Sequence, residues 1–400
     1  MRILFLTDNF PPEVNAPASR TFEHCREWVK MGMKVTVITC APNFPQGKVY
    51  EGYKNKLYQK EEIEGITVIR VWSYITANEG FIKRILDYVS YAMTATIAAL
   101  FQRCDLIIAT SPQFFTAVAG HMVSFLKRKP WIMEVRDLWP ESIRAVGAMK
   151  PGRLYHFLEK LELFLYKKAQ KIVVVTDSFR ENLIQRGVPS EKITVIKNGV
   201  LLDHYQPTAK DPELLRSLAL ENKFIVTYLG THGMAHALDF IIRSAQKLPD
   251  NVCVLLIGDG AEKNNLIALK EKLAAKNIYM LPSVPKSSIG NYIAISDVAL
   301  VNLRKSDTFK GVIPSKIFEN AAMMKPVLLG VEGESKAIIE KYNAGVCFEP
   351  ENEAELTEAL GRMMNPENYR QYQQGCIELA RDFDRKNLAM KMLESIQAIS

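Results

Sequence analysis

The chain of 400 residues alternates short, almost wholly apolar runs with longer segments whose apolar positions recur every three or four residues. The short runs are typical of parallel strands buried on both faces, and the longer pattern is typical of amphipathic helices. The strands predicted in the first half are Arg2–Thr7, Val35–Thr39, Thr67–Val71, Leu106–Ala109, Trp131–Val135, Ile172–Val175 and Ile193–Ile196. Those predicted in the second half are Phe224–Leu229, Val252–Ile257, Tyr279–Leu281, Val298–Val301, Val327–Leu329 and Gly345–Phe348.

This repeated pattern predicts an α/β protein with two doubly wound, Rossmann-like domains, because one hydrophobic core rarely serves so long a chain. Turn residues at 197–207 interrupt the pattern and mark the boundary. We expect an N-terminal domain at 1–200, a C-terminal domain at 201–382 and a last helix within 383–400 that could cross back to the first domain. Ligands of open α/β sheets bind beyond the carboxyl ends of the strands, which predicts a site in the cleft between the domains.

Composition and charge narrow the class of protein. An apolar fraction of 48% and a mean hydropathy of −0.05 describe a soluble globular chain. Residues 1–200 hold 28 Lys and Arg against 19 Asp and Glu, whereas residues 201–400 hold 23 against 25. A basic first half favours an anionic surface as its partner, either a membrane or a polyanion, although ordinary solubilising charge is the alternative. The six scattered cysteines favour reduced thiols in a cytoplasm.

The segment 313–330 carries the strongest chemical signal. Pro314 fits the first turn of a helix, on which Ser315 and Glu319 would share one face. The free N–H groups at a helix start suit a phosphate, and a carboxylate one turn further on can accept two hydrogen bonds from a ribose diol. These features together predict a binding site for a nucleotide diphosphate.

Other residues of the second half are further candidates for binding an anion. A glycine-rich loop that lets backbone N–H groups approach an anion follows the first strand of the second domain and comprises Gly230, Thr231, His232 and Gly233. Gly258 follows the next strand and gives a weaker signal of the same kind, with a simple turn as the alternative. A leaving diphosphate would need a cation, and the candidates are Arg304, Lys310 and Lys316, with a solvated loop as the alternative for each.

In the first domain, two segments at the ends of strands hold candidate chemistry. Ser19 could cap the helix that follows the first strand. After the strand at 131–135, Asp137 could act as a base or orient an acceptor hydroxyl, and Arg136 could pair with phosphate or with Asp137. A purely structural ion pair is the alternative. The apolar helix at 81–103 is flanked by cations, so that a lipid-facing helix competes with a buried core helix.

Three segments, at 10–20, 134–141 and 314–319, resemble motifs of the GT-B glycosyltransferases of family four, which use nucleotide sugars. The motifs are most similar to those of the O-antigen branch identified as N-acetyl-L-fucosaminyl (L-fucosamine) transferases. This resemblance implies two Rossmann-like domains that face each other across a cleft, with a UDP-sugar in the second domain and the acceptor in the first. It also implies retention of anomeric configuration without a metal ion, in agreement with Asp259, Asp297 and Asp307, none of which belongs to an Asp-x-Asp motif.

The resemblance further implies roles for individual residues. Glu319 would bind the ribose hydroxyls, the backbone at Pro314–Lys316 would lie near the diphosphate, and Gly230–Gly233 would approach the diphosphate or the sugar. The acceptor loop would hold Asn15, Ala16 and Arg20, and Arg136 would stand where many members have a histidine close to the transferred sugar.

The sequence departs from the family pattern at three places. Gly311 replaces the first acid of the Glu-x7-Glu pair, Asn15-Ala16 replaces a pair of glycines, and the usual Arg and Lys after the glycine-rich loop are absent from 231–238. We infer that Arg304 and Lys316 take over the role of those two cations.

We therefore expect a cytoplasmic glycosyltransferase, bound peripherally to the inner membrane, that acts in O-antigen or other lipopolysaccharide biosynthesis. It would transfer N-acetyl-L-fucosamine from UDP to a polyprenyl-diphosphate-linked saccharide, without a cofactor and without nucleic acid as a partner. Two alternatives stay open: a UDP-sugar 2-epimerase of the same fold, and a non-catalytic scaffold that binds nucleotide sugars. An oxidoreductase is disfavoured because no strand is followed by Gly-x-Gly-x-x-Gly.

Overall fold

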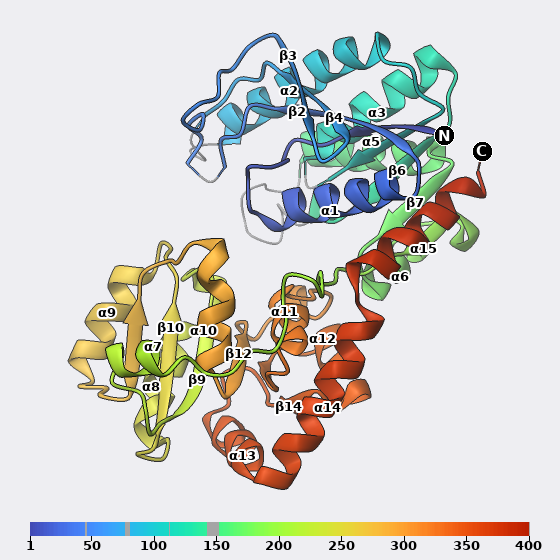
Figure 1. Cartoon of the computed structure of the whole chain (residues 1–400). Coiled ribbons are helices and arrows are strands. Elements are labelled where there is room, and N and C mark those ends of the chain that lie inside the picture. Colours follow the sequence, from blue (N-terminus) through green and yellow to red (C-terminus); the bar gives the residue numbers. More distant parts are fainter. Residues whose placement is uncertain (45, 77–80, 112, 142–151, 400) are drawn as a thin grey trace. The chain divides into compact units, whose positions relative to one another are not determined.

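The computed structural model of the protein describes residues 1–44, 46–76, 81–111, 113–141 and 152–399. The chain forms two compact units, Met1–Asn198 together with Arg385–Ser400, and Gly199–Asp384. Each unit is a twisted sheet with helices on both of its faces (Figure 1). None of the helices within the described ranges is long and apolar enough to span a bilayer.

The first unit is built on an eight-stranded sheet in the order β3-β4-β2-β1-β5-β6-β7-β8. Its strands are β1 (Arg2–Leu6), β2 (Lys34–Cys40), β3 (Tyr58–Ile63), β4 (Ile66–Val71), β5 (Leu106–Thr110), β6 (Trp131–Val135), β7 (Lys171–Val174) and β8 (Ile193–Val195). All neighbouring strands are parallel except β3, which pairs antiparallel with β4. Seven strands coincide with the predicted runs to within two residues at either end. The eighth, β3, was not predicted because it is a polar edge strand without an apolar run.

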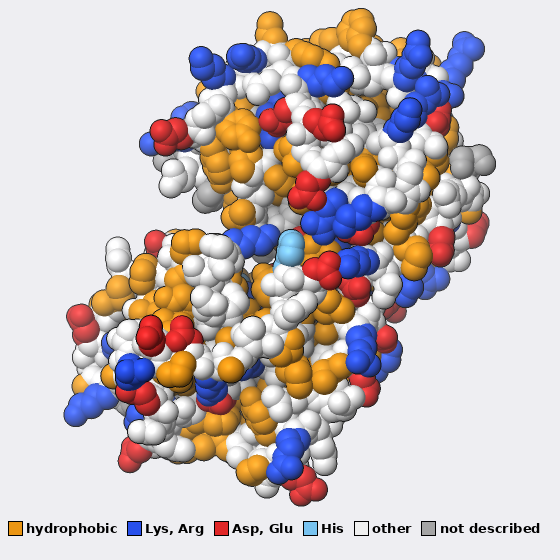
Figure 2. Space-filling model, viewed as in Figure 1, with side chains coloured by type: hydrophobic (Ala, Val, Ile, Leu, Met, Phe, Trp, Pro, Cys, Tyr) orange, Lys and Arg blue, Asp and Glu red, His pale blue; other side chains and the backbone are white. Residues whose placement is uncertain are grey.

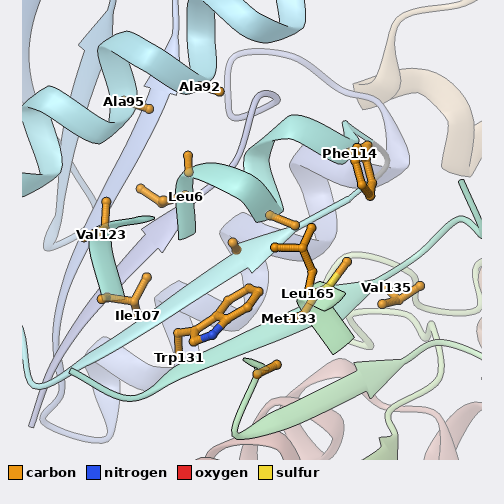
Figure 3. Packing of buried hydrophobic residues seen from close by; sticks show 14 of the residues in the cluster. Leu6, Ala92, Ala95, Ile107, Phe114, Val123, Trp131, Met133, Val135 and Leu165 are labelled. Atoms are coloured by element: carbon orange, nitrogen blue, oxygen red, sulfur yellow. The ribbon is translucent and has the colours of Figure 1, made fainter. Parts of the chain in front are cut away.

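Within the described ranges, six α-helices of the first unit cover this sheet. They are α1 (Ala16–Lys30), α2 (Phe81–Leu100), α3 (Phe114–Lys127), α5 (Arg153–Lys168), α6 (Asp177–Gln185) and α15 (Arg385–Gln397). Helices α2, α3 and α5 pack on one face, where Val123, Trp131 and Leu165 belong to one continuous core (Figure 3). On the other face α15 packs against α1, and Trp28 Nε1 donates a hydrogen bond to the Ala389 carbonyl at 2.8 Å. The last helix of the chain is therefore part of the first unit.

The start of α1 differs from the prediction. The helix begins at Ala16, and Asn15 caps it by accepting a hydrogen bond from Ala18 N at 2.8 Å. Ser19 therefore lies within the first turn, and its own N–H already donates to the Asn15 carbonyl. The prediction that Ser19 is the cap was wrong, because asparagine satisfies the free N–H groups as well as serine does and comes four residues earlier.

The second unit is built on a six-stranded, all-parallel sheet in the order β11-β10-β9-β12-β13-β14. Its strands are β9 (Phe224–Leu229), β10 (Val252–Ile257), β11 (Ile278–Leu281), β12 (Val298–Asn302), β13 (Val327–Gly330) and β14 (Gly345–Cys347). All six were predicted from the sequence. The strand order reverses between β9 and β12, and ligands of such sheets bind at this switch point.

Helices cover both faces of the second sheet. They are α7 (Pro212–Ser217), α8 (Leu238–Ser244), α9 (Lys263–Lys272), α10 (Ile289–Ile295), α11 (Lys316–Ala322), α12 (Glu334–Tyr342), α13 (Glu353–Met364) and α14 (Pro366–Asp382). Apolar residues of α8, α9 and α13 share one core with the sheet. On the opposite face, α11, α12 and part of α14 form a second core around Phe318. This packing fixes α11 beside the carboxyl ends of β9 and β12.

Candidate functional site

The glycine-rich loop after β9 packs directly on the loop after β10. Gly258 has φ +146°, and a Cβ atom there would lie 1.8 Å from the carbonyl oxygen of Gly230. A Cβ at Gly260 would lie 2.5 Å from the carbonyl oxygen of His232. Any side chain at these positions would collide with the backbone of the neighbouring loop. The close packing of the two loops therefore explains why residue 258 is a glycine, and this glycine does not by itself indicate a ligand-binding site.

Two backbone N–H groups of this loop are open for an anion. Those of Gly230 and His232 donate to carbonyls in the segment 257–259 at 2.9 and 2.8 Å. Those of Thr231 and Gly233 have no acceptor in the described part of the chain. At Gly233 a Cβ would make only ordinary contacts, so the backbone there is approachable. The loop therefore offers two donors of the kind that bind phosphate oxygens.

His232 holds this loop together without adding charge to it. Its side chain is fully buried, and burial together with nearby Lys263 and Lys316 lowers its pKa to about 4. The imidazole is consequently neutral at pH 7 and cannot serve as a cation for a diphosphate. The backbone of His232 joins the two loops, because its carbonyl also accepts a hydrogen bond from Glu262 N at 2.9 Å.

Lys316 places a cation over the same loop. Its Nζ lies 3.8 Å from the centroid of the Tyr228 ring, and a Cβ at Gly230 would come within 2.7 Å of it. Gly230, with φ +147°, thus leaves room for the ammonium group. Burial lowers the pKa of Lys316 to about 7, while Glu319 opposes this shift. An anion bound beside Nζ would stabilise the protonated form of the amine. The positive charge would in turn strengthen the binding of the anion.

The helix that carries Lys316 starts later than predicted. Helix α11 has seven residues and its N-cap is Ser315, whose side chain makes no capping bond. Pro314 therefore lies before the N-cap and outside the helix, although its carbonyl accepts a hydrogen bond from Ile317 N at 3.2 Å. Glu319 lies one turn inside the helix, three residues after Lys316. Ser315, Lys316 and Glu319 are thus brought together next to the loop of Gly230.

The other predicted cations already have protein partners. Arg304 donates to Asp239 at 3.0 Å, to Glu351 at 3.3 Å and to the Met234 carbonyl at 2.9 Å. Lys310 pairs with Asp307 at 2.6 Å. Arg304 thus holds the segment after the glycine-rich loop in place, and Lys316 is the better candidate for a diphosphate partner.

Lys263 is a cation near this loop that the sequence did not single out. Its Nζ donates to the carbonyls of Gly258 and Leu281 at 3.0 and 2.6 Å, and burial lowers its pKa. As the first residue of a polar helix it resembles a solvated lysine in the sequence. The only signal was its position three residues after Gly260.

The first unit contains a cavity of about 260 Å³ at the carboxyl ends of its strands. Its walls come from the segments after β1, β2, β4, β5 and β6 and from the first two turns of α2. The lining residues are Asp8, Asn9, Asn15, Pro17, Asn43, Phe44, Gly47, Thr76, Arg84, Asp87, Tyr88, Gln113, Asp137 and Trp139. Two predicted site residues, Asn15 and Asp137, therefore line one pocket.

The end of β6 is tied to the start of α1 by Arg136. Its guanidinium donates to the carbonyls of Ala16 and Pro17, each at 3.1 Å, and burial lowers its pKa to about 9. The backbone N–H groups of Arg136 and Asp137 both donate to Ser111 Oγ, at 2.7 and 3.2 Å. These contacts fix Asp137 at the wall of the pocket and occupy the Ala16 carbonyl.

Arg20 has a structural role that the sequence did not reveal. Its side chain is 1% exposed and forms an ion pair with the equally buried Glu134 at 2.9 Å. Its remaining N–H groups donate to the Ile196 and Lys197 carbonyls at 2.8 Å and to Asn198 Oδ1 at 3.2 Å. The predicted contact of Arg20 with an acceptor is therefore corrected: the guanidinium joins α1 to β6 and to the end of the first unit.

Two further carboxylates in this pocket were missed. Asp8 follows β1 directly, and Asp87 lies in the second turn of α2. The position of Asp8 at the carboxyl end of a strand was a usable signal. Asp87 gave none, because it stands in a largely apolar helix 79 residues further along the chain.

Comparisons with known proteins match both units. Residues 15–199 match the model of the glycosyl transferase 4-like domain, and residues 211–382 match that of glycosyl transferases group 1. A curated relative, the putative colanic acid biosynthesis glycosyl transferase WcaI of Escherichia coli K12, is 24% identical over 99% of this chain and 100% of its own.

Solved structures resemble the chain over its full length. The Anabaena protein HepE in complex with UDP is 16% identical, with a TM-score of 0.71 and complete coverage of both chains. The sucrose-phosphate synthase of Thermosynechococcus elongatus is 14% identical, with a TM-score of 0.78 over 100% of this chain and 98% of its own. The two family models match one Rossmann-like unit each, and the solved structures share both units. The chain therefore belongs to the GT-B glycosyltransferases, with a glycosyl transferase 4-like domain followed by a group 1 domain.

Proposed function

We propose that this glycosyltransferase transfers a sugar from UDP to a polyprenyl-diphosphate-linked saccharide during synthesis of a surface polysaccharide. HepE was crystallised with UDP and with UDP-glucose, and the name of WcaI refers to colanic acid biosynthesis. Both support a UDP-sugar donor and a polysaccharide product. The motifs at 10–20 and 134–141 make N-acetyl-L-fucosamine, a component expected in an O-antigen, the first sugar to test.

The arrangement around Lys316 carries this proposal. Its ammonium group lies over Gly230, close to the open N–H groups of Thr231 and Gly233, and Glu319 follows one turn along the helix. A diphosphate between these groups would accept hydrogen bonds from two backbone N–H groups and would form an ion pair with one ammonium group. The carboxylate of Glu319 would then accept hydrogen bonds from the ribose hydroxyls.

The first unit would supply the acceptor site. The pocket that holds Asn15 and Asp137 has amide, carboxyl and aromatic groups on its walls, which suit a saccharide. Asp137 would orient the attacking hydroxyl, and the departing diphosphate, stabilised by Lys316, would help to accept its proton. Retention of configuration and independence of metal ions complete the proposed mechanism.

Replacing Glu319 by alanine is expected to weaken UDP binding by about 1.5–3 kcal/mol, the usual contribution of a hydrogen bond to a charged group. Isothermal calorimetry measures this directly. Glu340→Gln is the matched control, because Glu340 is an exposed acid on α12 of the same unit. Unchanged affinity in Glu319→Ala, or an equal loss in the control, would refute the ribose contact.

We propose the outer surface of α2 and α3 as the face that meets the membrane. The exposed large apolar side chains in the described part of α2 form one stripe along the helix, comprising Leu86, Met93, Ile97 and Leu100, and Phe101 follows directly. Lys127 Nζ donates to the Leu100 carbonyl at 2.9 Å, which holds the ends of α2 and α3 together. Phe125 and Leu126 are exposed beside this junction.

Basic residues border this apolar surface. Arg103 follows α2, and Arg128 and Lys129 follow α3, all of them exposed. Figure 2 shows hydrophobic and basic side chains next to each other over the end of the first unit that carries these helices. Aromatic and aliphatic side chains bordered by cations complement the anionic headgroups and acyl chains of a bilayer.

Vesicle flotation tests this face. The protein should bind vesicles that contain about one third anionic lipid and should bind neutral phosphatidylcholine vesicles much more weakly, since each cation near the surface contributes about 1 kcal/mol. Phe101→Ser with Phe125→Ser should abolish flotation. Leu57→Ser is the matched control, because Leu57 is 79% exposed in the same unit outside this surface. Equal binding by the double variant and wild type would contradict the assignment.

The activity itself is tested by mass spectrometry of lipid-linked products across a panel of UDP-sugars. We expect transfer from UDP-N-acetyl-L-fucosamine. Transfer from a different UDP-sugar alone would remove the sugar assignment. Binding of UDP without transfer or release of any sugar would favour the scaffold, and formation of a 2-epimer without acceptor would favour the epimerase.

A further inference from the structure

A buried glutamine at the start of α3 lines the pocket of the first unit and leaves one end of its amide unused. Gln113 is 2% exposed and is the N-cap of α3, but its side chain makes no capping bond. Its Oε1 accepts a hydrogen bond from Thr116 Oγ1 at 2.7 Å. Its Nε2 has no acceptor in the described part of the chain. A buried donor without an acceptor is rare in proteins and calls for an explanation.

The other amides of the first loop and of the segment after β2 are already engaged. Asn15 caps α1 through its Oδ1, and its Nδ2 donates to Asn9 Oδ1 at 2.7 Å. Asn43 Nδ2 donates to the Ala41 carbonyl at 2.9 Å. Among the lining residues that the structure describes, Gln113 is thus the one whose side chain holds a fully buried donor without an acceptor.

Packing holds the amide of Gln113 in place. Thr116, which binds its oxygen, is fully buried. Phe114, the next residue, stacks on Trp139 with the ring centroids 4.6 Å apart and so joins the start of α3 to the segment after β6. Gln113 and Trp139 both line the pocket. An amide fixed in this way is preorganised to donate to an oxygen of a ligand in the pocket.

The same pocket presents an aromatic ring to a ligand. Phe44 lines it and is 42% exposed. The peptide groups on both sides of Phe44 are fixed, because its N–H donates to Glu13 Oε1 at 2.9 Å and its carbonyl accepts from Tyr50 Oη at 2.6 Å. A pyranose complements these two features, since its hydroxyl oxygens accept hydrogen bonds and its C–H face packs on an aromatic ring.

We propose that Gln113 binds the acceptor sugar: its Nε2 donates a hydrogen bond to one oxygen of a pyranose that packs on the Phe44 ring, and Thr116 positions the amide. The inference rests on the proposed function, in which this pocket is the acceptor site. It assigns binding residues outside the segments 10–20, 134–141 and 314–319. It also predicts selection for a pyranose with an oxygen at one particular ring position, because a sugar without that oxygen leaves the donor unpaired.

Saturation-transfer NMR titrations of the full chain with UDP present test the assignment. The probes are the methyl glycosides of glucose, galactose, mannose and N-acetylglucosamine, followed by the monodeoxy analogues of the one that binds best. At least one analogue should bind wild type about tenfold more weakly than its parent. Gln113→Met keeps the length of the side chain but removes the donor. In this variant the parent should fall to the affinity of one such analogue, which should itself bind as it binds wild type.

The positioning role of Thr116 has its own readout. Thr116→Val removes the hydroxyl that holds the amide and should reduce the same preference to about threefold while the sugar still binds. Thr96→Val is the matched control, because it removes another buried hydroxyl, which donates to the Ala92 carbonyl at 2.7 Å within α2. Gln185→Met changes an exposed glutamine of α6 and controls for Gln113→Met. Both control variants should show the preference of wild type.

The contact with Phe44 is tested separately. Phe44→Ala should weaken all of the pyranosides by about three- to tenfold and should keep the preference among deoxy analogues, because it removes the apolar contact alone. Phe44→Tyr should restore binding. Phe157→Ala, at an α5 residue of the same unit that is 62% exposed, is the control and should change nothing. Because Phe44 is exposed, this comparison and that of Thr116→Val decide the matter if Gln113→Met does not fold.

The outcomes separate this inference from the proposed function. Failure of wild type to bind UDP in calorimetry, with sugar binding as expected, would count against the donor site alone. An unchanged preference among deoxy analogues in Gln113→Met, equal losses in Gln113→Met and Gln185→Met, or no binding of any pyranoside to wild type would each overturn the assignment of Gln113. Wild-type affinities in Phe44→Ala would overturn the stacking contact.

Discussion

Replacing Lys316 by methionine is expected to weaken binding of a UDP-sugar by about 2–4 kcal/mol, the usual cost of removing one partner of a charge pair that is shielded from water. Methionine keeps the length and apolar stem of lysine over the Tyr228 ring but removes the charge. The loss should appear as a thirtyfold or greater rise in Kd by calorimetry.

Lys325→Met is the matched control for this change. Lys325 is also a buried lysine of the second unit, with its pKa lowered to about 8 by burial, and its Nζ donates to the Ala294 carbonyl at 2.7 Å. It lies at the amino end of β13, away from the glycine-rich loop. It should lower the Tm without altering Kd. Equal losses of affinity in both variants would indicate damage to the fold.

The lowered pKa of Lys316 predicts that the affinity for a UDP-sugar depends on pH in the wild type and loses this dependence in Lys316→Met. Since the free amine is half neutral near pH 7, an anion that restores its charge must draw in a proton. Binding of UDP-glucose, whose diphosphate does not titrate near this pH, should take up a fraction of a proton at pH about 8 and should weaken as pH rises above about 7. Calorimetry in buffers of different ionisation enthalpy measures the uptake, which should vanish in Lys316→Met.

Replacing Asp137 by asparagine is expected to lower kcat by about 10²–10⁴, the range for loss of a positioned acid or base, with UDP affinity unchanged. The aspartate lines the pocket of the first unit, and two backbone contacts to Ser111 fix its segment. Product formation at saturating donor measures the effect.

Glu181→Gln is the control for Asp137, because Glu181 is an exposed acid of α6 in the same unit, outside the three family motifs. It should retain activity within about threefold, as surface changes away from a site usually do. An Asp137→Asn enzyme with wild-type kcat would remove Asp137 from the mechanism.

The strands were predictable because both sheets are buried on both faces, so that runs such as Trp131–Val135 and Phe224–Leu229 are almost wholly apolar. Strand β3 lacks such a run, because one edge of it is open to solvent and its residues alternate between exposed and half-buried. The turn that follows it, Glu64-Gly65, has positive φ at both residues and was the available signal for a hairpin.

The site was predictable only where its residues are neighbours in sequence. Ser315, Lys316 and Glu319 lie together at the start of α11, where the sequence predicted a helix, and their contacts with a nucleotide stay a prediction. The partners of Lys316 and Arg20 could not be foreseen, because Tyr228 is 88 residues from the first and Glu134 is 114 residues from the second. Distances of this kind depend on how strands are ordered in the sheet, which local patterns do not specify. The same holds for Asp8 and Asp87.

The most direct test of the account is a crystal structure of the protein with UDP. The account predicts the diphosphate between Lys316 Nζ and the N–H groups of Thr231 and Gly233, with the ribose hydroxyls on the carboxylate of Glu319. A nucleotide bound elsewhere, with these groups left without contact to it, would contradict the assignment of the donor site.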